Sequence, residues 1–191
     1  MFKLGLTLAL YATGACVLLA FVYTGTKTII EDRQQADLKA SLQELFPAGD
    51  SFEPVIGCGT SPDPAVTLSD SYSVKKSGTV IGMAISASTA SYGGPLKLLV
   101  GVNADSTISA VKILEHSDTP GLGANAASPT YFVNKPEKIT FYGQFSGKSA
   151  WDPFEVKNDV VAVTASTISS RAIANAVKIC TVAASDWFSG Q

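Results

Sequence analysis

The chain has 191 residues, 46% of them hydrophobic, with 14 Lys and Arg against 16 Asp and Glu. This length is enough for one domain with a sizeable core plus an appendage. Because the net charge is only −2, the chain offers no basic surface of the kind that binds nucleic acid, and we expect no DNA or RNA partner. Its one His and three scattered cysteines, Cys16, Cys58 and Cys180, lack the clustering of a zinc or iron–sulfur site, so no metal is expected.

The first element is an uncharged run from Leu4 to Tyr23. As a helix it would span about 30 Å, the thickness of the hydrocarbon core of a bilayer. A cleaved signal peptide is the first alternative, but the run is long for one and no small-x-small cleavage site closes it. A lipoprotein signal ending at Cys16 is the second, but the apolar run continues past that cysteine. The sequence therefore predicts an uncleaved membrane anchor at residues 1–27, followed by one domain at 28–191.

The next segments are a helix and a loop. From Thr28 to Phe46 apolar residues recur at helical spacing with charged residues between them, which predicts an amphipathic helix. From Phe52 to Leu68 three prolines give a composition typical of a loop rather than of a packed element. Cys58 lies in this loop. A disulfide from Cys58 to Cys180 would require an oxidising compartment, and the sequence does not establish that the two are close.

Strand-like segments follow, each rich in β-branched or apolar residues and separated by Gly, Asp, Asn or Ser. They run from Tyr72 to Val74, from Val80 to Ser88, from Leu96 to Val102 and from Ile108 to Glu115. Residues 102–108 have the composition of a hairpin connection, and residues 159–163 are expected to form a further strand that leads into a helix. Such a run of strands, with helices before and after it, predicts an α+β fold with an antiparallel sheet.

Five hydroxyl side chains crowd the start of the last helical pattern, between Thr164 and Ser170. From Ile168 onward apolar residues recur mostly at three- and four-residue steps, which indicates that a helix begins here. A Ser or Thr at this place ordinarily caps the helix by accepting a hydrogen bond from one of its unpaired amides. The same amides and the positive end of the helix dipole also form a site for a phosphate. The residues alone leave both interpretations open.

The stretch Thr164-Ala165-Ser166-Thr167-Ile168-Ser169 resembles the S/T-G-A-T-x-S/T signature of a family of FMN-binding domains. These domains occur in two membrane redox complexes, in the G component of the Rnf complex and in the C component of the sodium-pumping NADH:quinone reductase. In the family the Thr at the fourth place carries FMN through a phosphoester bond, which implies Thr167 as the attachment site. Ala165 and Ser166 depart from the signature, since the family usually has Gly and Ala there, but both substitutes are small.

A second match runs from His116 to Gly123 and is similar to the family's H-x-E/D-T-P-G-L-G segment. It supplies a hydroxyl, a rigid turn, unhindered amides and one apolar side chain, which suit the edge and face of a flavin ring. The resemblance implies that Thr119, Gly121, Leu122 and Gly123 bind the cofactor. We expect His116 to be structural, because electron transfer by the family requires no protein base.

Two shorter elements complete the resemblance. Tyr92-Gly93-Gly94 has strong turn chemistry when read alone, and the family carries a similar Gly-Tyr-Gly element beside its flavin. Tyr92, Gly93 and Gly94 are therefore expected in the pocket. The segment from Phe141 to Lys148 resembles a family element of the form Q-F-x-G-K, which makes Lys148 a candidate partner of the flavin phosphate.

The resemblance implies an electron-transfer subunit that carries covalent FMN in a membrane-bound, ion-translocating ferredoxin:NAD oxidoreductase, the Rnf complex. Its partners would be the membrane and the other Rnf subunits, and it would have no catalytic turnover of its own. The lack of a long extra segment favours the Rnf component over the quinone-reductase component. A different interpretation is a membrane-anchored assembly or binding module of a redox complex without a bound cofactor.

The charges that flank the anchor and the resemblance favour opposite orientations. Lys3 precedes the apolar run, whereas Lys27, Arg33 and Lys39 follow it closely, and by the positive-inside rule this favours a cytoplasmic domain. Long domains can nevertheless cross the membrane regardless of such charges. Because the family's flavin domain is extracytoplasmic, the resemblance implies a single-pass protein of the cytoplasmic membrane with its domain outside.

Overall fold

The computed structural model describes residues 2–56 and 58–190. They form two compact units, Met1–Ser41 and Leu42–Gln191. The first unit is helical, and the second contains every strand that the structure describes. The predicted domain boundary between residues 27 and 28 remains a prediction, because the helix α1, Phe2–Leu45, runs across it without a break.

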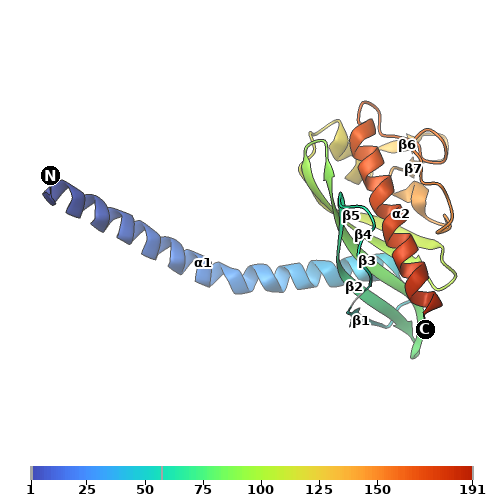
Figure 1. Ribbon diagram of the computed structural model, residues 1–191, viewed down its shortest axis with the longest axis horizontal. Helices are drawn as coiled ribbons and strands as arrows, with labels where there is room; N and C mark the ends of the chain where they lie inside the picture. The colour runs from blue at the N-terminus through green and yellow to red at the C-terminus, as the bar shows by residue number, and fades with distance from the viewer. Residues whose placement is uncertain (1, 57, 191) are drawn as a thin grey trace. The chain divides into compact units, whose positions relative to one another are not determined.

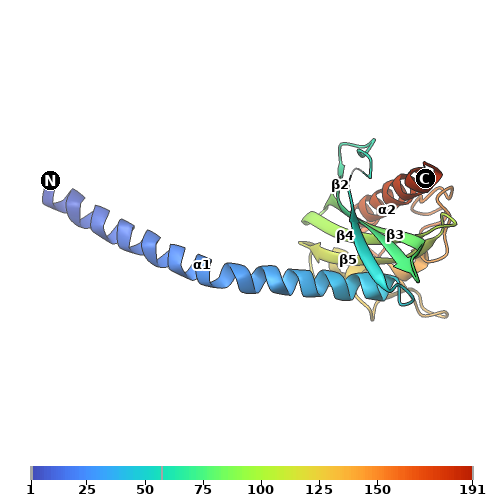
Figure 2. The same cartoon turned by 90° about the horizontal axis from the view of Figure 1, so that it is seen from below.

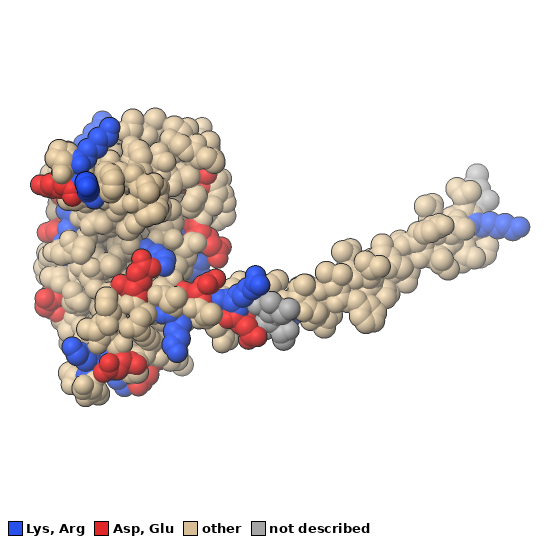
Figure 3. All heavy atoms as spheres, turned by 180° about the vertical axis from the view of Figure 1, so that it is seen from behind, with Lys and Arg blue, Asp and Glu red and all other residues tan. Residues whose placement is uncertain are grey.

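Helix α1 is long and apolar enough to cross a membrane, and no residue of its most apolar stretch is buried. The predicted anchor, Leu4 to Tyr23, falls within it. Its visible face is uncharged over most of its length (Figure 3). The hydroxyls of four threonines along the helix each donate to a backbone carbonyl about one turn earlier, as a polar group in hydrocarbon requires. These are Thr7, Thr13, Thr24 and Thr26.

The second unit is built on an antiparallel sheet whose strands lie in sequence order, β1-β2-β3-β4-β5. The strands are β1 Ser51–Val55, β2 Val66–Lys76, β3 Thr79–Ser91, β4 Gly94–Asn103 and β5 Ile108–His116. Helix α2, Thr167–Ser189, crosses one face of this sheet, mainly over β3 (Figure 1, Figure 2). The prediction of an α+β fold with an antiparallel sheet is thereby confirmed.

The chain between β5 and α2 contains only short elements. These are the 3-10 helices η1, Gly123–Ala127, and η2, Gly143–Phe145, and the small hairpin of β6, Phe132–Asn134, with β7, Ile139–Thr140. Much of this connection is held by side-chain contacts rather than by a ladder of backbone hydrogen bonds. Local sequence patterns therefore gave little indication of its course.

The two ends of the segment from Phe52 to Leu68 belong to strand β1 and to the start of β2, so its prediction as a loop was wrong there. Pro54 lies in β1, opposite Tyr72 of β2. Proline cannot donate to a ladder, but β1 is an edge strand and needs partners on one side only. The proline that suggested a loop is thus compatible with the outermost place in the sheet.

The strand predicted at residues 159–163 is also wrong, since only an isolated bridge between Val156 and Val160 occurs there. The side chain of Gln144 forms the hydrogen bonds with backbone groups that a neighbouring strand would otherwise form. The amide of Gln144 donates to the Val161 carbonyl over 3.1 Å, and the Val161 N–H donates back to Gln144 Oε1 over 2.8 Å. The apolar run therefore contributes Val160 and Val163 to the core without joining a sheet.

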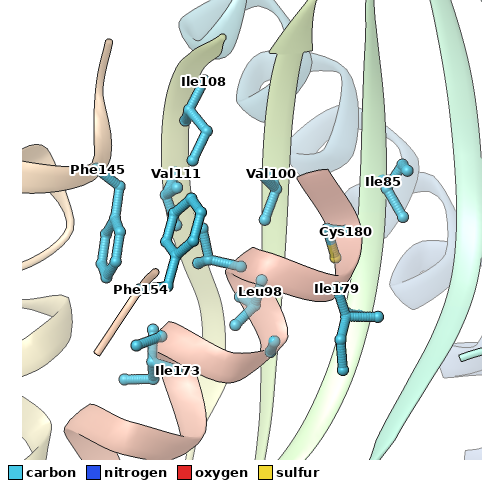
Figure 4. Close-up of a cluster of buried hydrophobic side chains, with 14 of the residues drawn as sticks. Ile85, Leu98, Val100, Ile108, Val111, Phe145, Phe154, Ile173, Ile179 and Cys180 are labelled. Carbon is cyan, nitrogen blue, oxygen red and sulfur yellow. The ribbon is translucent and has the colours of Figure 1, made fainter. Parts of the chain in front are cut away.

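The main core lies between the sheet and α2. Figure 4 shows the sheet residues Ile85, Leu98, Val100 and Val111 beside Ile173, Ile179 and Cys180 of α2, with Phe145 and Phe154 from the long connection. The opposite face of the sheet is covered by Leu42, Leu45 and Phe46, all of which are buried. The central strands β3 and β4 thus have long runs of residues that are buried on both faces.

Two glycines make room for the ring of Phe46 on that opposite face. A Cβ at Gly82 would lie 2.5 Å from a ring carbon and 2.8 Å from the Val102 carbonyl oxygen, and one at Gly101 would lie 2.8 Å from the ring. We expect Gly82→Ala to lower the free energy of unfolding by about 1–3 kcal/mol through overpacking. Thermal unfolding of the detergent-solubilised chain measures this. Adding Phe46→Leu should recover part of the loss, whereas purely additive effects would contradict the contact.

Cys58 and Cys180 are free thiols that lie in the same core. Burial raises the pKa of Cys180, and it also raises the pKa of Cys58. Both groups therefore remain protonated and unreactive at neutral pH, because the thiolate is the reactive form. In this structure they act as small apolar side chains.

Candidate functional site

A cleft of about 440 Å³ opens where three segments distant in the sequence meet. They are the β3–β4 turn, the loop that follows β5 and the first turn of α2. Its walls are Tyr92, Asp118, Thr119, Leu122, Gly123, Ala165, Ser166, Thr167 and Ile168. The three segments are among those that the sequence singled out, and the fold brings them together at one end of the sheet.

Large apolar side chains stand open to solvent around this cleft. Tyr92 is 76% exposed, Ile168 59% and Leu122 44%. Apolar groups gathered around a concave surface are typical of a ligand site, because a bound molecule removes them from water. Their arrangement suits a flat, largely apolar ring.

The first turn of α2 leaves its amides free for a ligand. The N–H groups of Thr167, Ile168 and Ser169 have no acceptor among the described residues, and the N-cap residue Ser166 makes no side-chain capping bond. The capping interpretation of this stretch is therefore wrong for Ser166. Unpaired amides at the positive end of a 23-residue helix form a site for an anion such as phosphate.

The hydroxyls around the helix start divide into two groups. Ser170 donates to the Ser166 carbonyl over 2.9 Å and accepts from the Val163 N–H over 3.0 Å, while Ser169 donates to Asp118 over 3.0 Å. Those two hydroxyls fix the start of α2 to the residues before it and to Asp118. The hydroxyls of Thr164, Ser166 and Thr167 form no hydrogen bond to the described residues, and of these three Thr167 stands at the first helical position.

Ala165 adopts the left-handed conformation, with φ +58°. That conformation is easy for glycine and strained for other residues, which explains why a glycine suits this place in the signature. Alanine has the smallest side chain after glycine and keeps the turn at a modest cost. The departure at Ala165 therefore leaves the geometry of the helix start in place.

We expect Ala165→Gly to raise the free energy of unfolding by up to about 1 kcal/mol by relieving this strain. The matched control is Ala172→Gly in α2, where the helical backbone gains nothing from glycine and about 1 kcal/mol should be lost. Chemical denaturation should show a higher free energy of unfolding for Ala165→Gly and a lower one for Ala172→Gly. Equal losses in both would show that the turn does not hold Ala165 in the left-handed region.

Asp118 joins the three segments and was missed as a site residue. Its Oδ1 accepts hydrogen bonds from the Gly93 N–H at 2.8 Å and from the Ser169 hydroxyl at 3.0 Å. A Cβ at Gly93 would lie 2.6 Å from Asp118 Cα, and a Cβ at Gly123 would lie 2.5 Å from its carboxyl carbon. Both glycines are thus needed for the carboxyl group to fit. The available signal was that Asp118 is the acidic position of the His116–Gly123 motif.

Several predicted residues support the cleft without lining it. Ser169 is buried behind it, and Gly93 and Gly94 shape the turn that carries Tyr92. Gly121 sits at the exposed loop tip with φ +80°. Thr164 is exposed, and its N–H donates to the Tyr131 hydroxyl over 3.3 Å.

Lys148 and His116 are not brought to the cleft. The Lys148 ammonium lies 2.9 Å from Asp159, which also accepts hydrogen bonds from the backbone N–H groups of Phe154 and Glu155. Burial alone would raise the pKa of Asp159, but Lys148 and these N–H groups outweigh it and lower that pKa. His116 is exposed at the end of β5. We therefore leave both residues out of the site proposed below.

Residues 91–181 match the model of the FMN-binding domain, and residues 1–45 match the model of the RnfG N-terminal region. The first match spans all three segments of the cleft. The chain therefore contains an FMN-binding domain, which follows an N-terminal helix long and apolar enough to cross a membrane.

Relatives extend this likeness over nearly the whole chain. The chain is 32% identical to the G component of the ion-translocating oxidoreductase complex of Methanosarcina acetivorans, over 92% of this chain and 89% of that protein. It is 31% identical to the G component of the Na⁺-translocating ferredoxin:NAD⁺ oxidoreductase complex of Acetobacterium woodii, over 93% and 88%. A proton-translocating counterpart from Clostridium ljungdahlii is 30% identical over 91% and 84%. The chain belongs to the RnfG family, whose members are components of ion-translocating Rnf complexes.

Proposed function

We propose that the chain is the FMN-carrying electron-transfer subunit of a membrane-bound, ion-translocating ferredoxin:NAD oxidoreductase. Its relatives are named as the G component of such complexes, and its domain matches an FMN-binding model. The observation that carries the proposal is the meeting of three separate segments around one cleft at the free amides of α2. As a subunit it takes part in the redox reaction of the complex, with other Rnf subunits and the membrane as its partners.

The residues of the cleft fit FMN in each of its parts. Tyr92, Leu122 and Ile168 give apolar contact for the ring. The free amides of Thr167 and its neighbours suit the phosphate. Bound FMN supplies the ability to exchange one or two electrons, while the protein fixes its position and surroundings.

We further propose that Thr167 holds the FMN covalently through its Oγ1. Thr167 is half-buried at the cleft, its hydroxyl has no hydrogen-bond partner among the described residues, and the free amides beside it would receive the phosphate oxygens. The bond joins Oγ1 to the phosphorus of an activated FMN donor, whose leaving group departs as the hydroxyl proton is released. No electron is transferred in this step. The remaining proposed contacts come from residues 164–169, 119–123 and 92–94.

The alternative, an assembly or binding module without a cofactor, predicts a colourless protein. Under the flavin proposal the purified complex should show the visible absorbance bands of a flavin, and these should stay with this chain after denaturation. A wild-type chain with no flavin absorbance would favour the alternative.

We propose that the anchor ends near residue 27 and that the domain at 28–191 is extracytoplasmic, where covalent attachment prevents loss of the cofactor. A tag fused after residue 191 should then be cleaved by protease added outside spheroplasts. A cytoplasmic protein of the same cells serves as the lysis control. Protection of the tag until lysis would show that the Lys and Arg residues after the apolar run set the topology instead.

A further inference from the structure

The carboxyl group of Asp118 has one oxygen that the protein leaves without a partner. Among the described residues only Ser86 Oγ and Asp118 Oδ2 are buried side-chain oxygens without a hydrogen bond. Asp118 is 6% exposed and lines the cleft, whereas Ser86 does not. Buried polar groups in native proteins are nearly always paired, so this oxygen indicates a donor that comes from outside the chain.

The orientation of this carboxyl group is fixed by its surroundings. Oδ1 is held by the Gly93 N–H on one side and by the Ser169 hydroxyl on the other. Gly93 and Gly123 both lack the Cβ that would collide with Asp118 or its neighbour Ser117. A side chain locked in this way presents its second oxygen in one direction, which is the requirement for a specific polar contact.

We propose that Asp118 Oδ2 accepts a hydrogen bond from an N–H or O–H group of the bound flavin, in its ring or in its ribityl chain. This inference rests on the proposed FMN function. The phosphate is excluded as the partner, because its oxygens are acceptors and its charge is repelled by a carboxylate. The isoalloxazine ring offers its N3–H as a donor, and the ribityl chain offers its hydroxyls. Asp118 is then a positioning residue that links the cofactor to all three segments of the cleft.

The decisive variant is Asp118→Asn in the full chain within its complex. Asparagine keeps an acceptor for Gly93 and Ser169, but it replaces Oδ2 by an NH₂ group that cannot accept a hydrogen bond. It also removes a negative charge beside the flavin, so reduction should become easier. We expect the reduction equilibrium to shift at least tenfold, which for a two-electron couple is a rise of about 30 mV in midpoint potential.

Asp63→Asn is the matched control. Asp63 is also a loop carboxylate that contacts α2, through Asn175 at 2.7 Å, but it does not line the cleft. Its substitution should leave the flavin potential unchanged. A purely structural role of Asp118 would likewise leave the potential unchanged once circular dichroism showed a folded domain, and that result would overturn the inference.

Binding of free flavins distinguishes the two candidate donors, the N3–H of the ring and the hydroxyls of the ribityl chain. In the full chain with Thr167→Val, lumiflavin presents the ring N3–H without ribityl hydroxyls, and N3-methylriboflavin presents the hydroxyls without the N3–H. The flavin that lacks the donor should bind about tenfold or more weakly than riboflavin. Asp118→Asn should weaken the binding of riboflavin to the same extent. It should leave the binding of the flavin that lacks the donor unchanged.

These measurements also keep the inference testable if Asp118→Asn does not fold, since the flavins are then compared on the unchanged carboxyl group. Equal binding of all three flavins would overturn it. If no free flavin binds, the inference is tested by the midpoint potential of the covalent flavin in Asp118→Asn compared with the wild type. A wild-type chain without any flavin would defeat the proposed function itself, which is a different outcome from a flavin protein that is indifferent to Asp118.

Discussion

Replacing Thr167 by Val should abolish covalent flavin completely while the domain stays folded. Valine has nearly the shape of threonine and removes only the hydroxyl that we propose as the alcohol of the phosphoester. Because the Thr167 hydroxyl makes no hydrogen bond to the described residues, its loss should change the free energy of unfolding by well under the ~1 kcal/mol typical of a lost cap. Fluorescence of the denatured chain on a gel under ultraviolet light, followed by intact mass, reads the result.

Two neighbouring hydroxyls give the controls for this variant. Ser166→Ala and Thr164→Val remove the other unpaired hydroxyls of the stretch and should each retain the full flavin mass. Covalent flavin that survives in Thr167→Val but disappears in one of these would move the bond to that residue. A wild-type chain without covalent flavin would end the attachment hypothesis altogether.

Leu122→Asp should change the flavin without unfolding the protein. Leu122 lines the cleft and is 44% exposed, so an aspartate there stays hydrated in the empty site but lies against the apolar ring once flavin is bound. We expect a lower midpoint potential, since the added negative charge opposes reduction, together with a shifted visible spectrum. Redox titration and absorbance measure these effects, and circular dichroism should be nearly unchanged.

Ile56→Asp is the control for this charge. Ile56 is fully exposed and takes no part in the cleft, so the same substitution there should leave the spectrum and the potential as in the wild type. An unaltered spectrum and potential in Leu122→Asp would remove Leu122 from the pocket.

The sequence predicted those features that depend on neighbours along the chain. The composition of residues 102–108 predicted a hairpin connection, and the hydroxyls before Ile168 predicted the start of a helix; both occur. The segments that form the cleft were also found, because each carries a motif that can be recognised locally. Their meeting at a single place could be inferred only from the family resemblance.

Features that depend on distant partners were not predictable in this way. Pro54 suggested a loop, but it lies in a strand at the edge of the sheet. The backbone groups of Val161 form hydrogen bonds with the side chain of Gln144, which is distant in the sequence. Lys148 has a partner, Asp159, that the motif around it does not show. The role of Asp118 depends on Gly93 and Ser169, which are 25 and 51 residues away along the chain.

The wide spacing of the three cleft segments determines when in the life of the protein the site can exist. Synthesis delivers the β3–β4 turn first and the start of α2 last, and the carboxyl group of Asp118 meets Ser169 only after α2 has packed onto the sheet. Contacts between such distant residues close long loops, and the entropy of loop closure makes such contacts slow to form. A nascent chain that lacks α2 therefore has no complete cleft, and an enzyme that recognises the assembled cleft would add flavin only to chains that had completed folding. Flavin content would then report the fraction of subunits that had matured correctly.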